Sequence, residues 1–258
     1  MKKALTATVL AFSMLVPASS LAADKKVRIG VEGAYPPFSL VDSDGDLQGF
    51  DIDIAEALCV AMNAECTLVT QDWDGIIPAL LARKYDAIIA SMSITEERKQ
   101  KVDFSDKYYQ TPARFARRKG SGIEITQEGV QGKSVGVQRA TVTDTFLTDN
   151  FGDAVEIKRY GTLDEAVLDM TSGRIDLILA DSVVLSEAFL DTEKGADFEF
   201  IGPAYTDARW FGEGIGIAVR KGDDELREAF NAAIKSIREN GTYQAISDEY
   251  FEFDIYGD

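Results

Sequence analysis

The sequence has 258 residues, of which 44 are acidic and 27 are basic, so its formal net charge at neutral pH is −17. This acidity argues against nucleic acid and anionic lipid as partners, because their phosphate groups would be repelled. The acidity can serve to keep an exported protein soluble, or it can attract a cationic ligand. The chain has no histidine and two cysteines, which excludes Ser-His-Asp and Cys-His catalysis and the usual zinc sites. We therefore expect no catalytic residue, no metal site and no cofactor.

Residues 1–22 have the features of a secretory signal peptide. Two lysines precede an apolar run from Ala4 to Val16, and Ser20 and Ala22 occupy the small-residue positions before a cleavage site. The run is shorter than the roughly 18 to 20 apolar residues of a membrane-spanning helix. No cysteine lies at the cleavage site, so we expect a periplasmic protein without a direct membrane anchor.

Strands alternate with helices through the first half of the chain. The expected elements are a strand from Lys26 to Val31, a tight turn at Asp44-Gly45, a helix from Phe50 to Met62, a strand from Cys66 to Val69, a helix from Ile76 to Leu81 and a strand from Tyr85 to Ala90. Asp51 is expected to cap the first helix, and Asp72 or Asp74 the second. This alternation is typical of a mostly parallel sheet and predicts the α/β class.

Cys59 and Cys66 lie close together in the sequence. In an oxidising compartment such a pair is expected to form a disulfide bond. Because the spacing is not Cys-x-x-Cys, a structural role is favoured over a redox role.

The second half of the chain repeats the pattern of the first. RKYDAIIAS at 83–91 aligns with GRIDLILAD at 173–181, and RIGVE at 28–32 aligns with SVGVQ at 134–138. Two short matches in the same order predict two lobes of one type, with a cleft between them.

The lobes are expected to be joined by hinge segments near 108–114 and 205–214. A helix with Leu226 and Ile237 on its apolar face ends at Asn240-Gly241, and a last helix carries Tyr243 and Tyr250. These helices are expected to pack back on the first lobe. The first lobe is therefore discontinuous, 23–110 plus 213–258, and the second lobe covers 111–212.

The strand that ends at Ala90 is followed by Ser91 and Ser93, at the end of a parallel strand where α/β sheets bind ligands. Ser93 and Glu96 are expected to form a capping box at the next helix. Arg98, in the same turn, offers a planar fork of donors that matches a carboxylate. The pattern predicts an anion site, with a solvated surface arginine as the alternative.

In the second lobe, Asp181 ends the equivalent strand and could hold an ammonium group. Thr141 and Thr143, which follow the strand ending at Gln138, could supply amide and hydroxyl donors. For all three residues, helix capping is the alternative interpretation.

Tyr35 and Trp73 stand in two loops of the first lobe, where their rings could sandwich an aliphatic stem or a cation. Glu32 lies on the same loop as Tyr35 and could reach a distal positive charge. Core packing is the alternative for the rings, and a surface carboxylate is the alternative for Glu32.

Several stretches of the sequence, taken together, resemble the polar amino-acid-binding proteins of bacterial ABC importers (solute-binding protein family 3), closest to their lysine/arginine/ornithine-binding and histidine-binding branch. They are IGVEGAYPPF, LQGFDIDIAEALC, DWDGIIPALLARKYDAIIASMSITEERKQ, ENGTYQ and YFEFDIYGD. The resemblance covers essentially the whole mature chain. It implies a monomer whose two α/β lobes, joined by a two-strand hinge, close over an amino acid. The partner implied is an inner-membrane ABC permease with a cytoplasmic ATPase.

The resemblance also implies which residues bind the α-carboxylate and the α-ammonium of the ligand. Arg98 would grip the α-carboxylate with the amides of Ser93 and Thr141. Asp181 would hold the α-ammonium, helped by Ser93 and the carbonyl of Ser91. The Cys59–Cys66 bridge also matches this branch.

For the ligand side chain, the resemblance implies a sandwich between Tyr35 and Trp73, where the family often has Tyr and Phe. Glu32 matches an aspartate that binds the distal cation of lysine or arginine. Ala90 replaces a serine that helps to bind the side-chain nitrogen, and Val142 stands where a polar residue is usual. The expected ligand is arginine, ornithine or lysine, with a neutral polar amino acid or an opine as the alternative.

A binding protein is expected rather than an enzyme. The alternative is a dehydratase-like enzyme on the same fold, for which Glu32 is the only obvious general acid. A clamp made of Arg98 and Asp181 favours binding. A sensory receptor is disfavoured because the sequence offers no membrane span.

Overall fold

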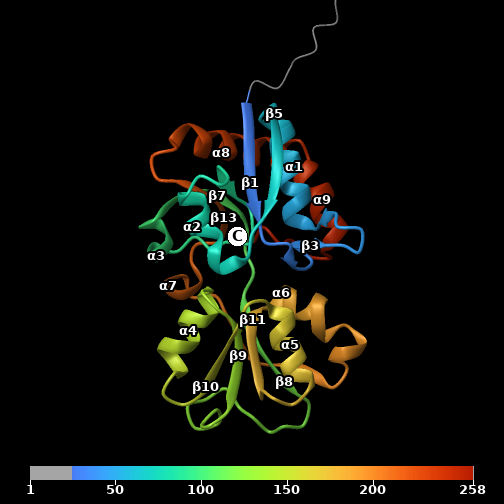
Figure 1. Ribbon diagram of the computed structural model, residues 1–258. Coiled ribbons are helices and arrows are strands. Elements are labelled where there is room, and N and C mark those ends of the chain that lie inside the picture. Colours follow the sequence, from blue (N-terminus) through green and yellow to red (C-terminus); the bar gives the residue numbers. More distant parts are fainter. Residues whose placement is uncertain (1–24, 258) are drawn as a thin grey trace, which may run out of the picture.

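The computed structural model describes residues 25–257, so the predicted signal peptide lies outside the described residues. Two lobes, each built around a five-stranded sheet flanked by helices, lie one above the other (Figure 1). The two-lobe α/β architecture expected from the sequence is confirmed. Within the described residues, no helix is both long and apolar enough to cross a membrane.

The sheet of the first lobe combines strands from both ends of the chain. In spatial order its strands are β5 (Ala64–Thr70), β1 (Lys25–Val31), β6 (Ala87–Ile88), β13 (Ile215–Arg220) and β7 (Val102–Tyr109). β1 is parallel to β5 and β6, whereas β13 is antiparallel to β6 and β7. The helices that cover it are α1 (Phe50–Ala61), α2 (Ile76–Leu81), α8 (Asp224–Glu239) and α9 (Thr242–Tyr250).

The second lobe has the same arrangement. Its strands, in spatial order, are β10 (Glu156–Tyr160), β9 (Ser134–Gln138), β11 (Leu177–Asp181), β8 (Ala113–Arg118) and β12 (Phe198–Tyr205), and its helices are α4 (Val142–Phe151), α5 (Leu163–Thr171) and α6 (Ser182–Leu185). Again β9 is parallel to its neighbours β10 and β11, and β8 is antiparallel to β11 and β12.

Smaller elements complete the fold. They are the three-stranded sheet of β2 (Ala34–Tyr35), β3 (Ser39–Val41) and β4 (Leu47–Gln48), and the short helices η1 (Trp73–Gly75), α3 (Glu96–Lys99), η2 (Ser186–Leu190), η3 (Glu193–Gly195) and α7 (Ala208–Phe211). The chain crosses between the lobes twice, from β7 to β8 and from β12 through α7 to β13, which gives the expected two-strand connection.

The sequence repeat corresponds to a repeated hydrogen bond from a backbone N–H group to an aspartate side chain. Asp86, just before β6, accepts a bond from the backbone N–H of Arg28 in β1 (3.1 Å), and Asp176, just before β11, accepts one from Ser134 in β9 (2.9 Å). The first strands of the two lobes are therefore held in the same way. Both end at the cleft, where Glu32 and Gln138 occupy equivalent positions.

The core of the first lobe is continuous with the C-terminal helices. Phe50 of α1 packs against Tyr243 and Tyr250 of α9, and Asn240 is the C-cap of α8, before Gly241, whose φ is 84°. The prediction that the C-terminal helices return to the first lobe is confirmed. The predicted disulfide bond is also confirmed: it joins Cys59 of α1 to Cys66 of β5 with a Cα–Cα distance of 6.1 Å.

Helix α1 begins one residue before Asp51. Gly49 is the N-cap with φ 122°, and a Cβ at this position would lie 2.5 Å from the carbonyl oxygen of Phe38. The prediction that Asp51 caps the helix is wrong, because this close approach requires glycine at the cap. Asp51 falls inside the first turn, and its side chain is buried.

The predicted aspartate cap of the second helix is also wrong. Asp72 stands at the N-cap of η1 without a side-chain cap hydrogen bond, and Asp74 pairs with Arg139 of the second lobe at 2.6 Å. Since the carboxylate of Asp74 bonds the facing lobe, it does not cap a helix in its own lobe.

Helix α3 is capped by Thr95, whose Oγ1 accepts a hydrogen bond from the amide of Arg98 (3.3 Å). The predicted capping box of Ser93 and Glu96 is wrong, because Ser93 still pairs in extended form with Ile215 of β13.

Candidate functional site

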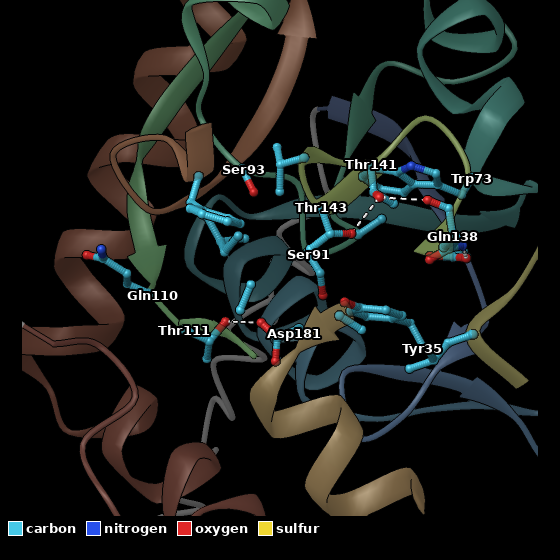
Figure 2. Close-up of a pocket in the computed structure, with 18 of the residues that line it drawn as sticks. Tyr35, Trp73, Ser91, Ser93, Gln110, Thr111, Gln138, Thr141, Thr143 and Asp181 are labelled. Carbon is cyan, nitrogen blue, oxygen red and sulfur yellow. Dashed lines mark hydrogen bonds between the residues drawn. The ribbon is translucent and has the colours of Figure 1, made fainter. Parts of the chain in front are cut away.

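A cavity lies between the two lobes, at the carboxyl ends of the parallel strands (Figure 2). All nine ligand-binding residues expected from the sequence line this cavity, namely Glu32, Tyr35, Trp73, Ala90, Ser91, Ser93, Arg98, Thr141 and Asp181. The fold therefore brings together side chains that are up to 149 positions apart in the chain, from Glu32 to Asp181.

Arg98 is held in place at one end of the cavity. One guanidinium nitrogen donates to the carbonyl oxygen of Ser93 (3.1 Å), and the guanidinium carbon lies 5.1 Å from the centre of the Trp73 ring. Burial lowers the pKa of Arg98 to about 10, so the side chain remains cationic at neutral pH. A fixed guanidinium with further N–H donors can bind a carboxylate through two parallel hydrogen bonds.

Thr141 caps α4 from the second lobe. Its Oγ1 accepts a hydrogen bond from the amide of Asp144 (3.2 Å), donates to the carbonyl of Gln138 (2.7 Å) and lies 2.8 Å from Oγ1 of Thr143. The hydroxyl is thus engaged in capping, as the alternative interpretation held, while the residue also lines the cavity. The N-terminus of α4 adds partial positive charge at this point.

Asp181 ends β11 and has a different partner for each carboxylate oxygen. Oδ1 accepts hydrogen bonds from the amides of Val183 (2.8 Å) and Val184 (3.2 Å), and Oδ2 accepts one from the hydroxyl of Thr111 (Figure 2). Burial raises the pKa of Asp181 to about 6, although these bonds oppose the rise. The group is therefore a helix cap and, at neutral pH, an anion that can hold an ammonium group.

Two aromatic rings border the cavity. In Figure 2 the rings of Tyr35 and Trp73 lie apart, on different sides of the space. Trp73 is 8% exposed, and its Nε1–H donates to the carbonyl of Ala140 in the second lobe (3.1 Å). Flat faces on separate walls suit an extended aliphatic chain or a planar cation.

Glu32 bonds to the second lobe across the cleft. Its Oε1 accepts a hydrogen bond from Nε2 of Gln138 (2.5 Å). Burial raises the pKa of Glu32 to about 7; the bond from Gln138 lowers it, and the charges of Asp51 and Asp72 raise it further. A cation placed beside Glu32 would favour its ionised form.

Ala90 and Val142 contribute apolar surface to the cavity wall. Ala90 is 1% exposed. Neither side chain can form a hydrogen bond, so the polar recognition of a ligand falls to the other residues of the site.

Asp51 is a buried carboxylate directly behind the cavity, and its importance was missed from the sequence. It accepts hydrogen bonds from the amide and hydroxyl of Ser91 (2.7 and 3.0 Å) and from the hydroxyl of Tyr108 (2.7 Å). Ser91 has a φ of 50°, a conformation rare outside glycine, and these bonds hold it there. Burial raises the pKa of Asp51 to about 7.

Gln138 and Thr111 also line the cavity but were not predicted as site residues. Gln138 could have been found from the repeat, because it aligns with Glu32. Thr111 had no such signal, since its bond to Asp181 depends on how the chain crosses between the lobes. Within residues 25–257, no group of three or more His, Cys, Asp or Glu side chains could hold a metal ion.

Comparison with known proteins shows that the sequence and the fold are similar to those of binding proteins. The bacterial extracellular solute-binding proteins, family 3, match residues 27–253. An L-arginine-binding protein of Pseudomonas aeruginosa is 51% identical over 258 residues, which are 100% of this chain and 99% of that protein. The lysine/arginine/ornithine-binding periplasmic protein of Escherichia coli is 41% identical over an alignment of 260 positions that covers 100% of both chains.

A solved structure gives the same result. A periplasmic binding protein of Salmonella typhimurium with high arginine specificity has a TM-score of 0.81 at 32% identity, covering 88% of this chain and 99% of that one. These matches confirm the resemblance and the fold expected from the sequence. The relatives are named for what they bind and not for a reaction, which confirms the expectation of a binding protein rather than an enzyme.

Proposed function

Because the chain belongs to the bacterial extracellular solute-binding proteins, family 3, we propose that it captures a basic amino acid between its lobes and delivers it to an inner-membrane ABC permease. The permease is driven by a cytoplasmic ATPase. The ligand is arginine, ornithine or lysine, and the relative named for L-arginine, at 51% identity, favours arginine.

The observation that carries the proposal is the arrangement of charge around one cavity. Arg98 is a buried cation beside donors of the first lobe, and Asp181 is a buried anion of the second lobe. Together they are complementary to the carboxylate and ammonium of an α-amino acid. Glu32 supplies a third charge, which matches a cation at the far end of the ligand side chain. The rings of Tyr35 and Trp73 would enclose the stem between the two ends.

Each ligand group contacts both lobes in this proposal. Arg98 and Ser93 from the first lobe share the α-carboxylate with the Thr141 amide from the second. Asp181 from the second lobe shares the α-ammonium with Ser93 and the Ser91 carbonyl. A ligand bound in this way stabilises the closed arrangement by contacts that an open one lacks.

The cellular setting follows from the same relationship. We propose cleavage of the signal peptide after Ala22 and release of a monomer into the periplasm, where relatives of this chain act. The first lobe is assigned to 23–110 plus 213–258 and the second to 111–212, with hinge segments near 108–114 and 205–214.

The direct test is thermal unfolding of the refolded mature protein in the presence of single amino acids, including ornithine, citrulline and an opine. A ligand at about 1,000 times its Kd adds about 4 kcal/mol to the free energy of unfolding. For a chain of this size the expected rise in Tm is roughly 8 to 16 °C. We expect that rise with arginine, ornithine or lysine.

The Arg98→Ala variant should lose the rise with every amino acid. Arg174→Ala is the matched control, because Arg174 is a surface arginine whose side chain is 69% exposed. A rise with glutamine or another neutral amino acid instead would retain the binding function and reject the basic ligand. No rise with any amino acid would reject the proposed function.

A further inference from the structure

We propose that Gln138 is a specificity-determining residue of this site, which selects a guanidinium over a primary ammonium at the far end of the ligand. The inference rests on the proposed capture of a basic amino acid. It concerns how the site distinguishes arginine from lysine.

Gln138 ends β9 and faces Glu32, which follows β1. The two residues occupy equivalent positions in the repeat, RIGVE and SVGVQ. The cleft brings these two strand ends together, and the side chains meet at 2.5 Å. Gln138 is 4% exposed, so its amide is removed from bulk solvent.

The orientation of the Gln138 amide is fixed by its partners. Its Nε2 donates to Oε1 of Glu32 (2.5 Å) and to the carbonyl oxygen of Gly161 (3.1 Å). Both partners are acceptors, so the nitrogen and not the oxygen of the amide must face them. These bonds use both N–H groups and leave the amide oxygen of Gln138 and the second carboxylate oxygen of Glu32 as acceptors on two side chains that line the cavity.

An acceptor pair of this kind suits a guanidinium better than an ammonium. The guanidinium of arginine is planar and presents several N–H donors in a fixed fork, so it can bond a carboxylate and a neighbouring amide oxygen together. The ammonium of lysine is a compact point charge, for which the Glu32 carboxylate alone supplies most of the attraction. Loss of the amide should therefore affect arginine more than lysine.

Gln138 also keeps Glu32 charged. Among the described residues, the groups that act on Glu32 are Gln138 from β9, Asp51 from α1, Asp72 beside η1 and Tyr35 from β2. Burial and the two aspartates raise the pKa of Glu32, and only the bond from Gln138 opposes this. Without that bond the carboxylate would ionise at a higher pH. Because the bond crosses the cleft, this part of the site is complete only when the lobes are in contact.

The test compares Gln138→Met, which keeps the length of the side chain and removes its hydrogen bonds, with the unaltered protein. Calorimetric titration with arginine, lysine and citrulline gives the ratio of Kd values, and the melting temperature without ligand checks the fold. At a pH high enough for Glu32 to be ionised in both proteins, we expect the Kd for arginine to rise about 10- to 100-fold, as for the loss of a hydrogen bond to a charged group, and the Kd for lysine to rise less than about 3-fold. The control is Gln131→Met, at an exposed glutamine of the same lobe, which should change neither value.

The pH profile provides the second readout. In Gln138→Met, the arginine affinity should continue to rise at pH values where that of the unaltered protein has levelled off. An equal loss for arginine and lysine, or no loss for either, would overturn the role of Gln138 while leaving the proposed function intact. If the unaltered protein binds no basic amino acid, the proposed function itself fails and the inference fails with it.

Discussion

Asp181 uses its two carboxylate oxygens for different tasks. Oδ1 caps α6, and Oδ2 accepts the hydroxyl of Thr111, which lies where the chain crosses from β7 to β8. An ammonium that binds Oδ2 would meet a carboxylate that is already oriented, so little additional ordering is required on binding. The same contact connects the ligand to a crossing between the lobes.

Trp73 contributes a hydrogen bond between the lobes as well as an aromatic ring. Its Nε1–H donates to the carbonyl of Ala140 across the cleft at 3.1 Å, a bond that phenylalanine at this position cannot form. We expect Trp73→Phe to retain the aromatic wall and to weaken arginine binding by about 2- to 10-fold, the usual effect of one neutral hydrogen bond. Because the bond joins the two lobes across the cavity, the change should appear as faster dissociation with little change in association.

Stopped-flow measurement of both rates checks this prediction. Tyr160→Phe is the control, because it removes one hydrogen bond, to Asp169 within the second lobe (2.8 Å), from a ring that does not line the cavity. A Trp73→Phe variant that releases arginine at the original rate would show that the cross-cleft bond contributes nothing to retention.

At the scale of elements, the disulfide bond fixes α1 to β5, and neither cysteine lines the cavity. Cys59 and Cys66 enclose a short loop, with a sequence separation of 7. The chain-entropy model gives such a loop about 2.5 kcal/mol of stabilisation. For the double variant Cys59→Ser, Cys66→Ser we expect the Tm to fall by roughly 5 to 10 °C.

Arginine affinity of the folded double variant should stay unchanged, since neither cysteine lines the cavity. Calorimetric unfolding and binding at a temperature well below the new Tm measure both quantities. A loss of affinity in the folded variant would mean that the α1–β5 connection also positions the site.

The same elements show what the sequence could predict. The repeat of RKYDAIIAS and GRIDLILAD predicted two lobes correctly, because each copy makes the same local hydrogen bonds to a first strand. The caps assigned to Asp51, Asp74 and Ser93 were wrong, because each of these residues is used by a partner distant in sequence or by a strand pairing. Local pattern therefore gave the elements and most of the cavity lining. It could not give Thr111, whose bond to Asp181 depends on how the chain crosses between the lobes, nor the bond from Gln138 to Glu32, which joins the two lobes.

At the scale of the whole molecule, the two lobes are joined across the cleft by polar contacts as well as by the two crossings of the chain. Arg139 of the second lobe pairs with Asp74 of the first at 2.6 Å, beside the bond from Trp73 to Ala140. Gln138 and Glu32 also meet across the cleft. The contact between the lobes therefore buries Glu32 in a protein whose formal net charge is already −17, which makes its ionised form costly in the absence of a bound cation.

This cost couples ligand binding to protons. Burial raises the pKa of Glu32 to about 7 and that of Asp181 to about 6, so near pH 6.5 both groups are partly protonated. Bound arginine would place its guanidinium beside Glu32 and its α-ammonium beside Asp181. Each cation favours the ionised carboxylate, so binding must lower both pKa values and release protons. Linkage then requires that arginine affinity rise with pH from about 5 and level off above about 8.

Calorimetric titration at pH 6.5 in two buffers of different ionisation enthalpy measures the protons released. We expect the apparent binding heat to differ between the buffers, and Glu32→Gln to release fewer protons because one of the two titrating groups is absent. Arg174→Ala, which alters only a surface ion pair, should release as many as the unaltered protein. Equal heats in both buffers would mean that the two carboxylates are already ionised before the ligand binds. Burial would then not raise their pKa values, and the prediction would be wrong.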